Sequence, residues 1–300
     1  MNQTGNEKLY TYYRGIWEKR KMNGHNPSQE AWDGRAQDWE KELKKTPGFF
    51  DGLDKRVNAT ASWLRSRSLL DSGSCVADIG CGPGRFAAEF ARTVKEVTCL
   101  DISEKMLEMG KEHVKACGCE NVNFLREDFS SFDVVKAGWE GKFDLVFASL
   151  TPAVGTVEDL EKLMSISRGC CFNSSFVRWE DELEQRIGRD VFGMENVAPG
   201  RGRDDWFYAF FNILWLKGYY PETSYYCMGR EASVSADEDQ ARYYAKCFSD
   251  NMTADERNVR RIYDYLRESA DSDGKISFRE EKWYGWILWD VRKRKMRGIQ

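Results

Sequence analysis

A glycine-rich turn between a short apolar run and a helical pattern constrains the fold of this chain more than any other feature. The run Cys75–Ile79 has the length and apolar character of a buried strand, and Gly80, Gly82 and Gly84 follow it directly. A helical pattern begins at residue 85. Glycine allows a tight turn and lets the backbone approach a ligand closely. The segment therefore predicts a strand–turn–helix unit with a ligand site at the end of the strand.

Strand and helix patterns alternate along the rest of the chain. Strands are expected at residues 75–79, 97–100, 122–125, 143–148, 170–174, 219–227 and 282–291. Helices are expected at residues 51–70, 85–94, 105–116, 160–167 and 206–216, with two more within 231–270. Strands separated by helices predict a parallel sheet covered on both faces, which is a doubly wound α/β fold.

Acidic residues recur at the strand ends that follow the turn. Asp78 stands just before Gly80, Asp101 ends the second strand, and Asp128 follows the third. The fourth strand leads into Ser149. In this order the elements resemble the motifs of the class I S-adenosylmethionine-dependent methyltransferases, and the resemblance covers about residues 74–152.

The resemblance implies a mostly parallel seven-stranded sheet with helical lid additions, and S-adenosylmethionine as the cofactor. It implies that Asp101 accepts hydrogen bonds from the ribose hydroxyls, that Asp128 lies near the adenine amino group and that a neighbouring side chain lies against the ring. Cys81 is expected to be a small residue that fits the turn. The implied cofactor-binding residues are Asp78, Gly80, Cys81, Gly82, Gly84, Asp101, Ile102, Met106, Asp128, Phe129 and Ser149.

The same turn also satisfies a dinucleotide fingerprint. Gly82, Gly84 and Ala87 match the GxGxxA form, and Asp101 could hold the ribose of NAD. This leaves an NAD-dependent oxidoreductase as an alternative. Asp78, the Asp128 element and the long helical sequence ahead of the first strand favour the methyl donor.

Methyl transfer from a sulfonium is an in-line displacement that mainly requires positioning and exclusion of water. We therefore assign no catalytic base. Residues 1–50 are expected to form a helical lid segment, and residues 51–300 the methyltransferase domain, with helical insertions near 178–204 and 231–270. By the same resemblance, candidates for the acceptor pocket are Tyr12, Tyr13, Trp17 and Trp32, for each of which plain packing is the competing interpretation.

The charge balance and the segment after the fourth strand bear on the acceptor. The net charge is −4, and basic residues are not clustered as a nucleic-acid site requires. Ser149-Leu-Thr-Pro152 differs from the Asn-Pro-Pro-Tyr segment of amino-directed nucleic-acid methyltransferases. These features favour a small-molecule acceptor over nucleic acid.

Cysteine and histidine usage bears on compartment and metals. The 9 cysteines contain no CxxC pair, and there are only 2 histidines. No apolar stretch is long enough to cross a membrane. We expect a reduced, cytoplasmic protein with neither a membrane association nor a metal centre.

One further pattern points to another class of protein. Residues 269–280 match an EF-hand loop at several positions, including Asp271, Asp273 and Glu280, but Ser269 stands where an acid is expected. A helix after this loop would conflict with the last strand. The favoured interpretation is a polar turn. A non-catalytic, S-adenosylmethionine-binding or calcium-responsive regulatory protein is the alternative.

Overall fold

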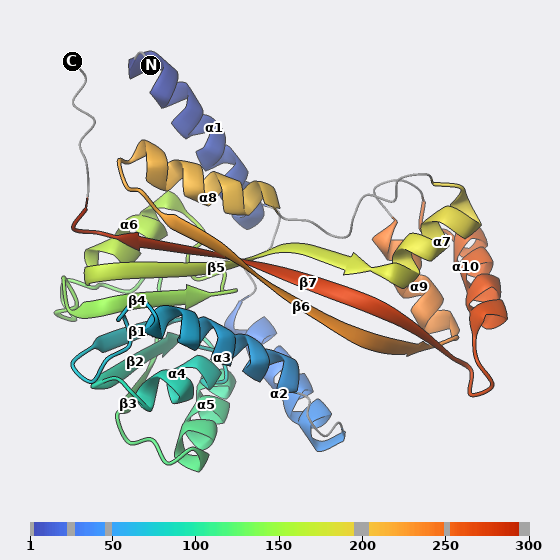
Figure 1. Ribbon diagram of the computed structural model, residues 1–300, viewed down its shortest axis with the longest axis horizontal. Helices are drawn as coiled ribbons and strands as arrows, with labels where there is room; N and C mark the ends of the chain where they lie inside the picture. Colours follow the sequence, from blue (N-terminus) through green and yellow to red (C-terminus); the bar gives the residue numbers. More distant parts are fainter. Residues whose placement is uncertain (1–2, 23–27, 46–49, 195–203, 249–252, 294–300) are drawn as a thin grey trace. The chain divides into compact units, whose positions relative to one another are not determined.

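The fold is described from a computed structural model, which covers residues 3–22, 28–45, 50–194, 204–248 and 253–293 (Figure 1). Its helices are α1 (Gln3–Met22), α2 (Gln29–Lys45), α3 (Asp51–Arg65), α4 (Arg85–Ala91), α5 (Glu104–Ala116), α6 (Val157–Ser165), α7 (Glu182–Phe192), α8 (Asp204–Leu216), α9 (Glu238–Cys247) and α10 (Glu256–Ser269). Its strands are β1 (Cys75–Ile79), β2 (Glu96–Asp101), β3 (Val122–Arg126), β4 (Phe143–Ser149), β5 (Ser167–Asp181), β6 (Glu222–Ser235) and β7 (Lys275–Asp290).

The strands form one seven-stranded sheet in the order β3-β2-β1-β4-β5-β7-β6. The ladders from β3 to β5 are parallel, and β7 runs antiparallel to its neighbours (Figure 1). The predicted mostly parallel, doubly wound sheet is confirmed. Because the carboxyl ends of β1, β2 and β4 lie at the same edge, the glycine turn and the residues after β2 and β4 are brought together there.

The chain divides into two compact units. The first comprises residues 1–175, 205–226 and 285–300, and the second comprises residues 176–204 and 227–284. Strands β5, β6 and β7 each contain residues of both units.

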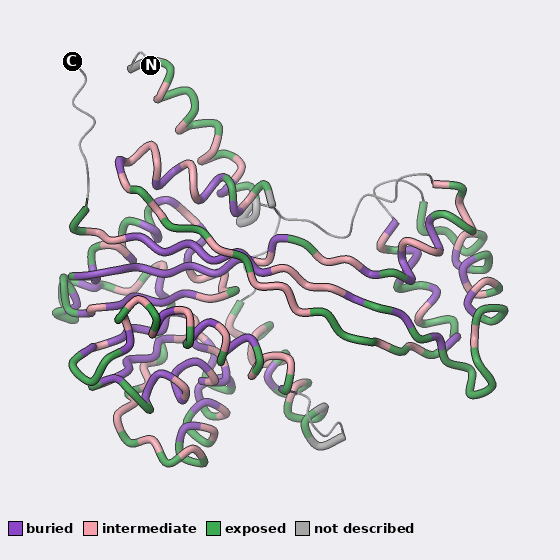
Figure 2. The backbone as a smooth tube through the Cα atoms, viewed as in Figure 1, coloured by how far each residue is buried: buried purple, intermediate pink, exposed green. Residues whose placement is uncertain are grey.

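Helices cover both faces of the sheet in the first unit. On one face, α3 and α4 pack on a cluster in which Phe147 and Phe172 stack with ring centroids 4.9 Å apart. On the other face, Phe210 of α8 meets Trp289 of β7 at 5.5 Å. Figure 2 shows that buried positions are concentrated along the central strands. Burial on both faces explains why β1, β2 and β4 are nearly continuous apolar runs.

The second unit has its own hydrophobic core. Apolar residues of α7, α9 and α10 meet the ends of β6 and β7, with Leu183, Tyr244 and Ile262 among the buried members. Helix α10 buries a single apolar stripe at Val259, Ile262 and Leu266, which is the spacing of an amphipathic helix.

The structure corrects the bounds of several predicted elements, including the last strand, which begins at Lys275 and not at residue 282. Residues 231–235 continue strand β6, so the helical part of 231–270 begins only at Glu238. Strand β5 extends to Asp181 and is followed by α7, whereas the sequence placed the strand end at residue 174.

The EF-hand-like segment forms a turn that leads into β7. The Asp271 carboxylate accepts hydrogen bonds from the Asp273 and Lys275 amides, both at 2.9 Å. Because β7 begins at Lys275, no helix follows this segment, in agreement with the favoured interpretation.

Candidate functional site

The three glycines of the turn all have left-handed backbones, with φ of +68° at Gly80, +52° at Gly82 and +66° at Gly84. Their surroundings differ. A Cβ at Gly80 would lie 2.0 Å from the Thr151 hydroxyl oxygen, and one at Gly84 would lie 2.9 Å from the Gly110 Cα. A Cβ at Gly82 would meet no atom within 4 Å. Gly80 and Gly84 are thus required for packing, whereas Gly82 borders open space.

Asp101 joins the end of β2 to this turn. One carboxylate oxygen accepts the Gly82 amide at 2.8 Å, and the other accepts the Ser103 amide at 2.9 Å. Burial raises the pKa of Asp101, and these backbone hydrogen bonds oppose that rise. An ionised carboxylate has about four acceptor positions, so it can take ligand hydroxyls in addition to the two amides.

Asp78 lies beneath the turn as a second, more deeply buried carboxyl group. It is 2% exposed, and its Oδ2 atom has no hydrogen-bond partner among the described residues. Burial, together with the nearby charge of Asp101, raises the pKa of Asp78 to about 8. A carboxyl group in this setting is protonated at neutral pH and can donate a hydrogen bond.

The other predicted residues around the turn are mostly buried. Cys81 is 7% exposed, and burial raises the pKa of its thiol. Met106 is 2% exposed, and its amide donates to the Ser103 hydroxyl that caps α5. Ile102 is half-buried between Asp101 and this cap. Cys81 has the properties of a packed thiol and not those of a nucleophile.

At the next strand end, Asp128 and Phe129 face different environments. Asp128 is exposed, and its carboxylate accepts the Ser130 amide at 3.0 Å. Phe129 is buried. Lys162 of α6 donates to the carbonyl oxygens of Phe129 and Ser130 at 3.0 and 2.7 Å, which fixes the path of this loop.

Ser149, at the end of β4, receives a hydrogen bond from a residue that the sequence analysis did not identify. Arg56 of α3 is 7% exposed, and its Nη1 donates to the Ser149 hydroxyl at 2.8 Å. The Arg56 guanidinium carbon also lies 5.1 Å from the centre of the Phe86 ring. Leu150 follows with φ of +52°, which is strained for a residue with a side chain.

The aromatic candidates at the N-terminus do not form one cluster. Trp17 is buried against α8, 4.7 Å from Phe210 between ring centroids. Tyr12 and Tyr13 contact each other, and Tyr12 is 62% exposed. Trp32 lies on α2 beneath the Arg35 guanidinium. Their assignment to an acceptor pocket stays a prediction.

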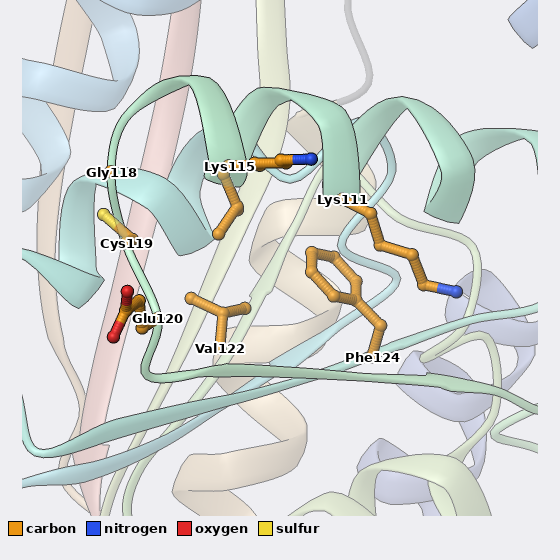
Figure 3. A pocket seen from close by; sticks show the side chains of 8 residues that line it. Lys111, Lys115, Gly118, Cys119, Glu120, Val122 and Phe124 are labelled. Atoms are coloured by element: carbon orange, nitrogen blue, oxygen red, sulfur yellow. The ribbon is translucent and has the colours of Figure 1, made fainter.

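A hollow of about 290 Å³ lies between α5 and β3 (Figure 3). Lys111 and Lys115 of α5 border it together with Val122 and Phe124 of β3. None of the predicted cofactor residues lines it. Within the described ranges, no group of three or more His, Cys, Asp or Glu side chains is arranged to hold a metal ion, and no helix is long and apolar enough to span a membrane.

Comparison with known proteins finds a methyltransferase domain around this site. Residues 76–169 match the model of a methyltransferase domain. A 23S rRNA (uracil(1939)-C(5))-methyltransferase, RlmD of Shewanella sediminis, is 30% identical over 127 residues, which cover 40% of this chain and 27% of that protein. An uncharacterized protein of Haemophilus influenzae is 23% identical over 259 residues, covering 83% of this chain and 88% of its own.

Two solved structures illustrate the structural matches. YcgJ of Bacillus subtilis has a TM-score of 0.46 at 14% identity, covering 80% of this chain and 100% of its own. Magnesium protoporphyrin IX methyltransferase of Synechocystis, with bound S-adenosylhomocysteine, has a TM-score of 0.42 at 16% identity, covering 79% and 83%.

The match to the RlmD proteins is partial, since the chain spans less than a third of their length. Residues 76–169, which match the methyltransferase-domain model, nevertheless contain the turn, Asp101, Asp128 and Ser149 in the order of the class I motifs. The chain therefore contains a methyltransferase domain, and the motifs of that domain are similar to those of the class I S-adenosylmethionine-dependent methyltransferases.

Proposed function

We propose that this enzyme methylates a small molecule. The observation that carries the proposal is the burial of polar side chains at the carboxyl end of β4 and beside it in the middle of β5. Asn173, Ser174 and Ser175 are each less than a tenth exposed, and so is Arg56, which reaches Ser149 from α3. An enclosed polar end suits a small acceptor, whereas a nucleic-acid strand needs an open, basic groove.

The donor's position follows from the same edge of the sheet. We propose that Asp101 holds the ribose hydroxyls, that the backbone at Gly82 lies against the donor, and that the loop at Asp128 holds the adenine end. When bound, S-adenosylmethionine supplies a methyl group on a positively charged sulfur. The side chains of Ser149 and Ser174 would orient the acceptor and exclude water from it.

An RNA acceptor is the competing candidate, because the RlmD proteins are named as 23S rRNA methyltransferases. Those matches cover a small part of each protein. The net charge of −4 also opposes binding to a polyanion.

Two further proposals concern the chain as a whole. Residues 1–50 would serve as a lid segment, in which Trp17 of α1 packs on α8. All nine cysteines are free thiols, which fits the reducing environment of the cytoplasm.

The test uses S-adenosylmethionine with a labelled methyl group. The purified protein is incubated with a metabolite extract of small molecules, and separately with total RNA and with ribosomal subunits. We expect label in the metabolite fraction alone. A protein with Asp101→Asn should transfer less label, which controls for contaminating enzymes. Label in RNA but not in metabolites would overturn the proposal.

A further inference from the structure

Asp33, on helix α2, lies outside every position that the motifs point to, yet its carboxylate contacts the start of α5, directly after Asp101 and β2. Its Oδ1 atom accepts the Ser103 hydroxyl at 2.6 Å and the Lys105 amide at 3.2 Å. Its Oδ2 atom accepts the Gln29 side-chain amide at 3.3 Å, from one turn earlier on α2. The Asp33 carboxylate is therefore fixed on the first turn of α5.

This position suits a negative charge. The first amides of a helix have no partner within the helix, and their partial positive charge attracts an anion. The Ser103 hydroxyl satisfies the Met106 amide at 3.1 Å, and Asp33 satisfies the Lys105 amide. Burial acts to raise the pKa of Asp33, but the hydrogen bonds from Ser103 and Lys105 lower it overall, so Asp33 is ionised here.

Ser103 connects this carboxylate to a second one. Its side chain is fully buried, and its hydroxyl donates to Asp33. Its backbone amide donates to Asp101 at 2.9 Å. The other oxygen of Asp101 accepts the Gly82 amide. A continuous set of hydrogen bonds thus runs from α2 through the cap of α5 to Asp101 and the glycine turn.

We propose that Asp33 is a positioning residue for the methyl donor, which fixes Ser103 and thereby holds the Asp101 carboxylate in place for the ribose hydroxyls. Asp33 does not itself touch the donor. The inference rests on the proposed function through one point only, the placement of the ribose at Asp101. It assigns to α2, which precedes the matched domain, a part in donor affinity.

The test measures binding of S-adenosylhomocysteine and of its 2′-deoxy analogue to the full chain by calorimetry. Removal of one hydroxyl that bonds to a charged carboxylate should weaken binding to the wild-type protein on the order of tenfold. With Asp33→Asn, this preference should fall to roughly two- to threefold, because loss of the charge weakens the hydrogen bonds that fix Ser103 and so leaves Asp101 less firmly held. The preference is a ratio measured on one sample, so a partly unfolded fraction does not affect it.

A matched control is available on the same helix. Asp38 is exposed and pairs with Lys41 at 3.1 Å, so Asp38→Asn makes the same chemical change away from α5. It should keep the full preference. Ser103→Ala removes the connecting hydroxyl and should reproduce the effect of Asp33→Asn, which provides a second variant if the first does not fold.

The outcomes separate the two proposals. An unchanged preference in both Asp33→Asn and Ser103→Ala overturns the positioning role. An equal loss of affinity for both ligands also overturns it, because Asp33 would then support the fold in general. If the wild-type protein binds S-adenosylhomocysteine without preferring the ribose 2′-hydroxyl, the placement of the ribose at Asp101 is wrong. If it does not bind S-adenosylhomocysteine, the proposed function itself fails.

Discussion

Replacing Gly82 with alanine separates the stability of the glycine turn from its capacity to bind a ligand. Gly82 has φ of +52°, and an added Cβ would meet no atom of the protein within 4 Å. The cost of the substitution is therefore conformational. A left-handed backbone costs a residue with a side chain about 1–2 kcal/mol, and the reduced freedom of the unfolded chain offsets about 0.4–1 kcal/mol of that. We expect a net loss of about 1 kcal/mol of unfolding free energy.

The loss of binding should be larger than the loss of stability. If the donor lies against the backbone at Gly82, the new methyl group occupies space that the donor needs. The dissociation constant for S-adenosylhomocysteine should then rise by at least about tenfold, which corresponds to about 1.4 kcal/mol. Thermal unfolding measures the stability, where the melting temperature should fall by about 2–4 °C, and calorimetry measures the binding.

Gly118 provides the control. It lies in the turn after α5, has φ of +71° and would also place a Cβ in open space. Gly118→Ala should lower the melting temperature by a similar amount and leave the dissociation constant unchanged. If Gly82→Ala binds S-adenosylhomocysteine as tightly as Gly118→Ala does, the donor does not lie against this turn, and the reasoning is refuted.

Three other predictions concern buried or half-buried polar groups. Because burial raises the pKa of Asp78 to about 8, the unliganded protein should lose stability as pH rises from about 4 to 8. Asp78→Asn should flatten the plot of melting temperature against pH. Parallel plots for the wild-type protein and the variant would contradict this. Lys162→Met leaves the Phe129 carbonyl without its donor, so it should destabilise the unliganded protein by about 1–2 kcal/mol in denaturant unfolding. It should also weaken the binding of S-adenosylhomocysteine. Unchanged affinity would exclude a role of the loop at Phe129 in binding the donor. Tyr244→Phe removes the hydroxyl that donates to buried Asp181 at 3.2 Å and should destabilise by about 1–3 kcal/mol; hydrogen exchange should speed up in α7 and α9, and no change there would contradict the contact.

The parts of the fold that the sequence predicted well are those buried on both faces of the sheet. The predicted strand 75–79 coincides with β1, and the predicted strand 143–148 differs from β4 by one residue. Continuous apolar runs bounded by glycine or charged residues have few alternative structures. The turn, Asp101 and Ser149 lie at one edge of the sheet because parallel strands bring their carboxyl ends together there.

The long strands were harder to predict because their outer halves are polar. The second half of β6 alternates, with Ala232 and Val234 packed against the core of the second unit and Glu231 and Ser233 exposed. This alternation of packed and exposed residues is present in the sequence. Its apolar members are short and have charged residues nearby, so the segment resembled the start of a helix.

Arg56 and Asp33 could not be predicted from local sequence. Both are charged residues within amphipathic helices, where exposure is the usual outcome. Their partners, Ser149 and Ser103, lie far along the chain, and only the packing of α3 and α2 brings each pair together. Their positions depend on tertiary structure, which no local pattern encodes.

The division of the first unit into three chain segments has a consequence for synthesis. Trp286 and Leu288 belong to the same buried cluster as Val76 and Phe90, yet more than half of the chain is made between them. A growing polypeptide can pair β1 with β2 and β4 early, but it can complete this core only after β7 has left the ribosome. Until then, a nascent chain exposes the apolar surface that Trp286 later covers. Truncations that stop before residue 285 should therefore aggregate or be degraded even when they contain every donor-binding motif.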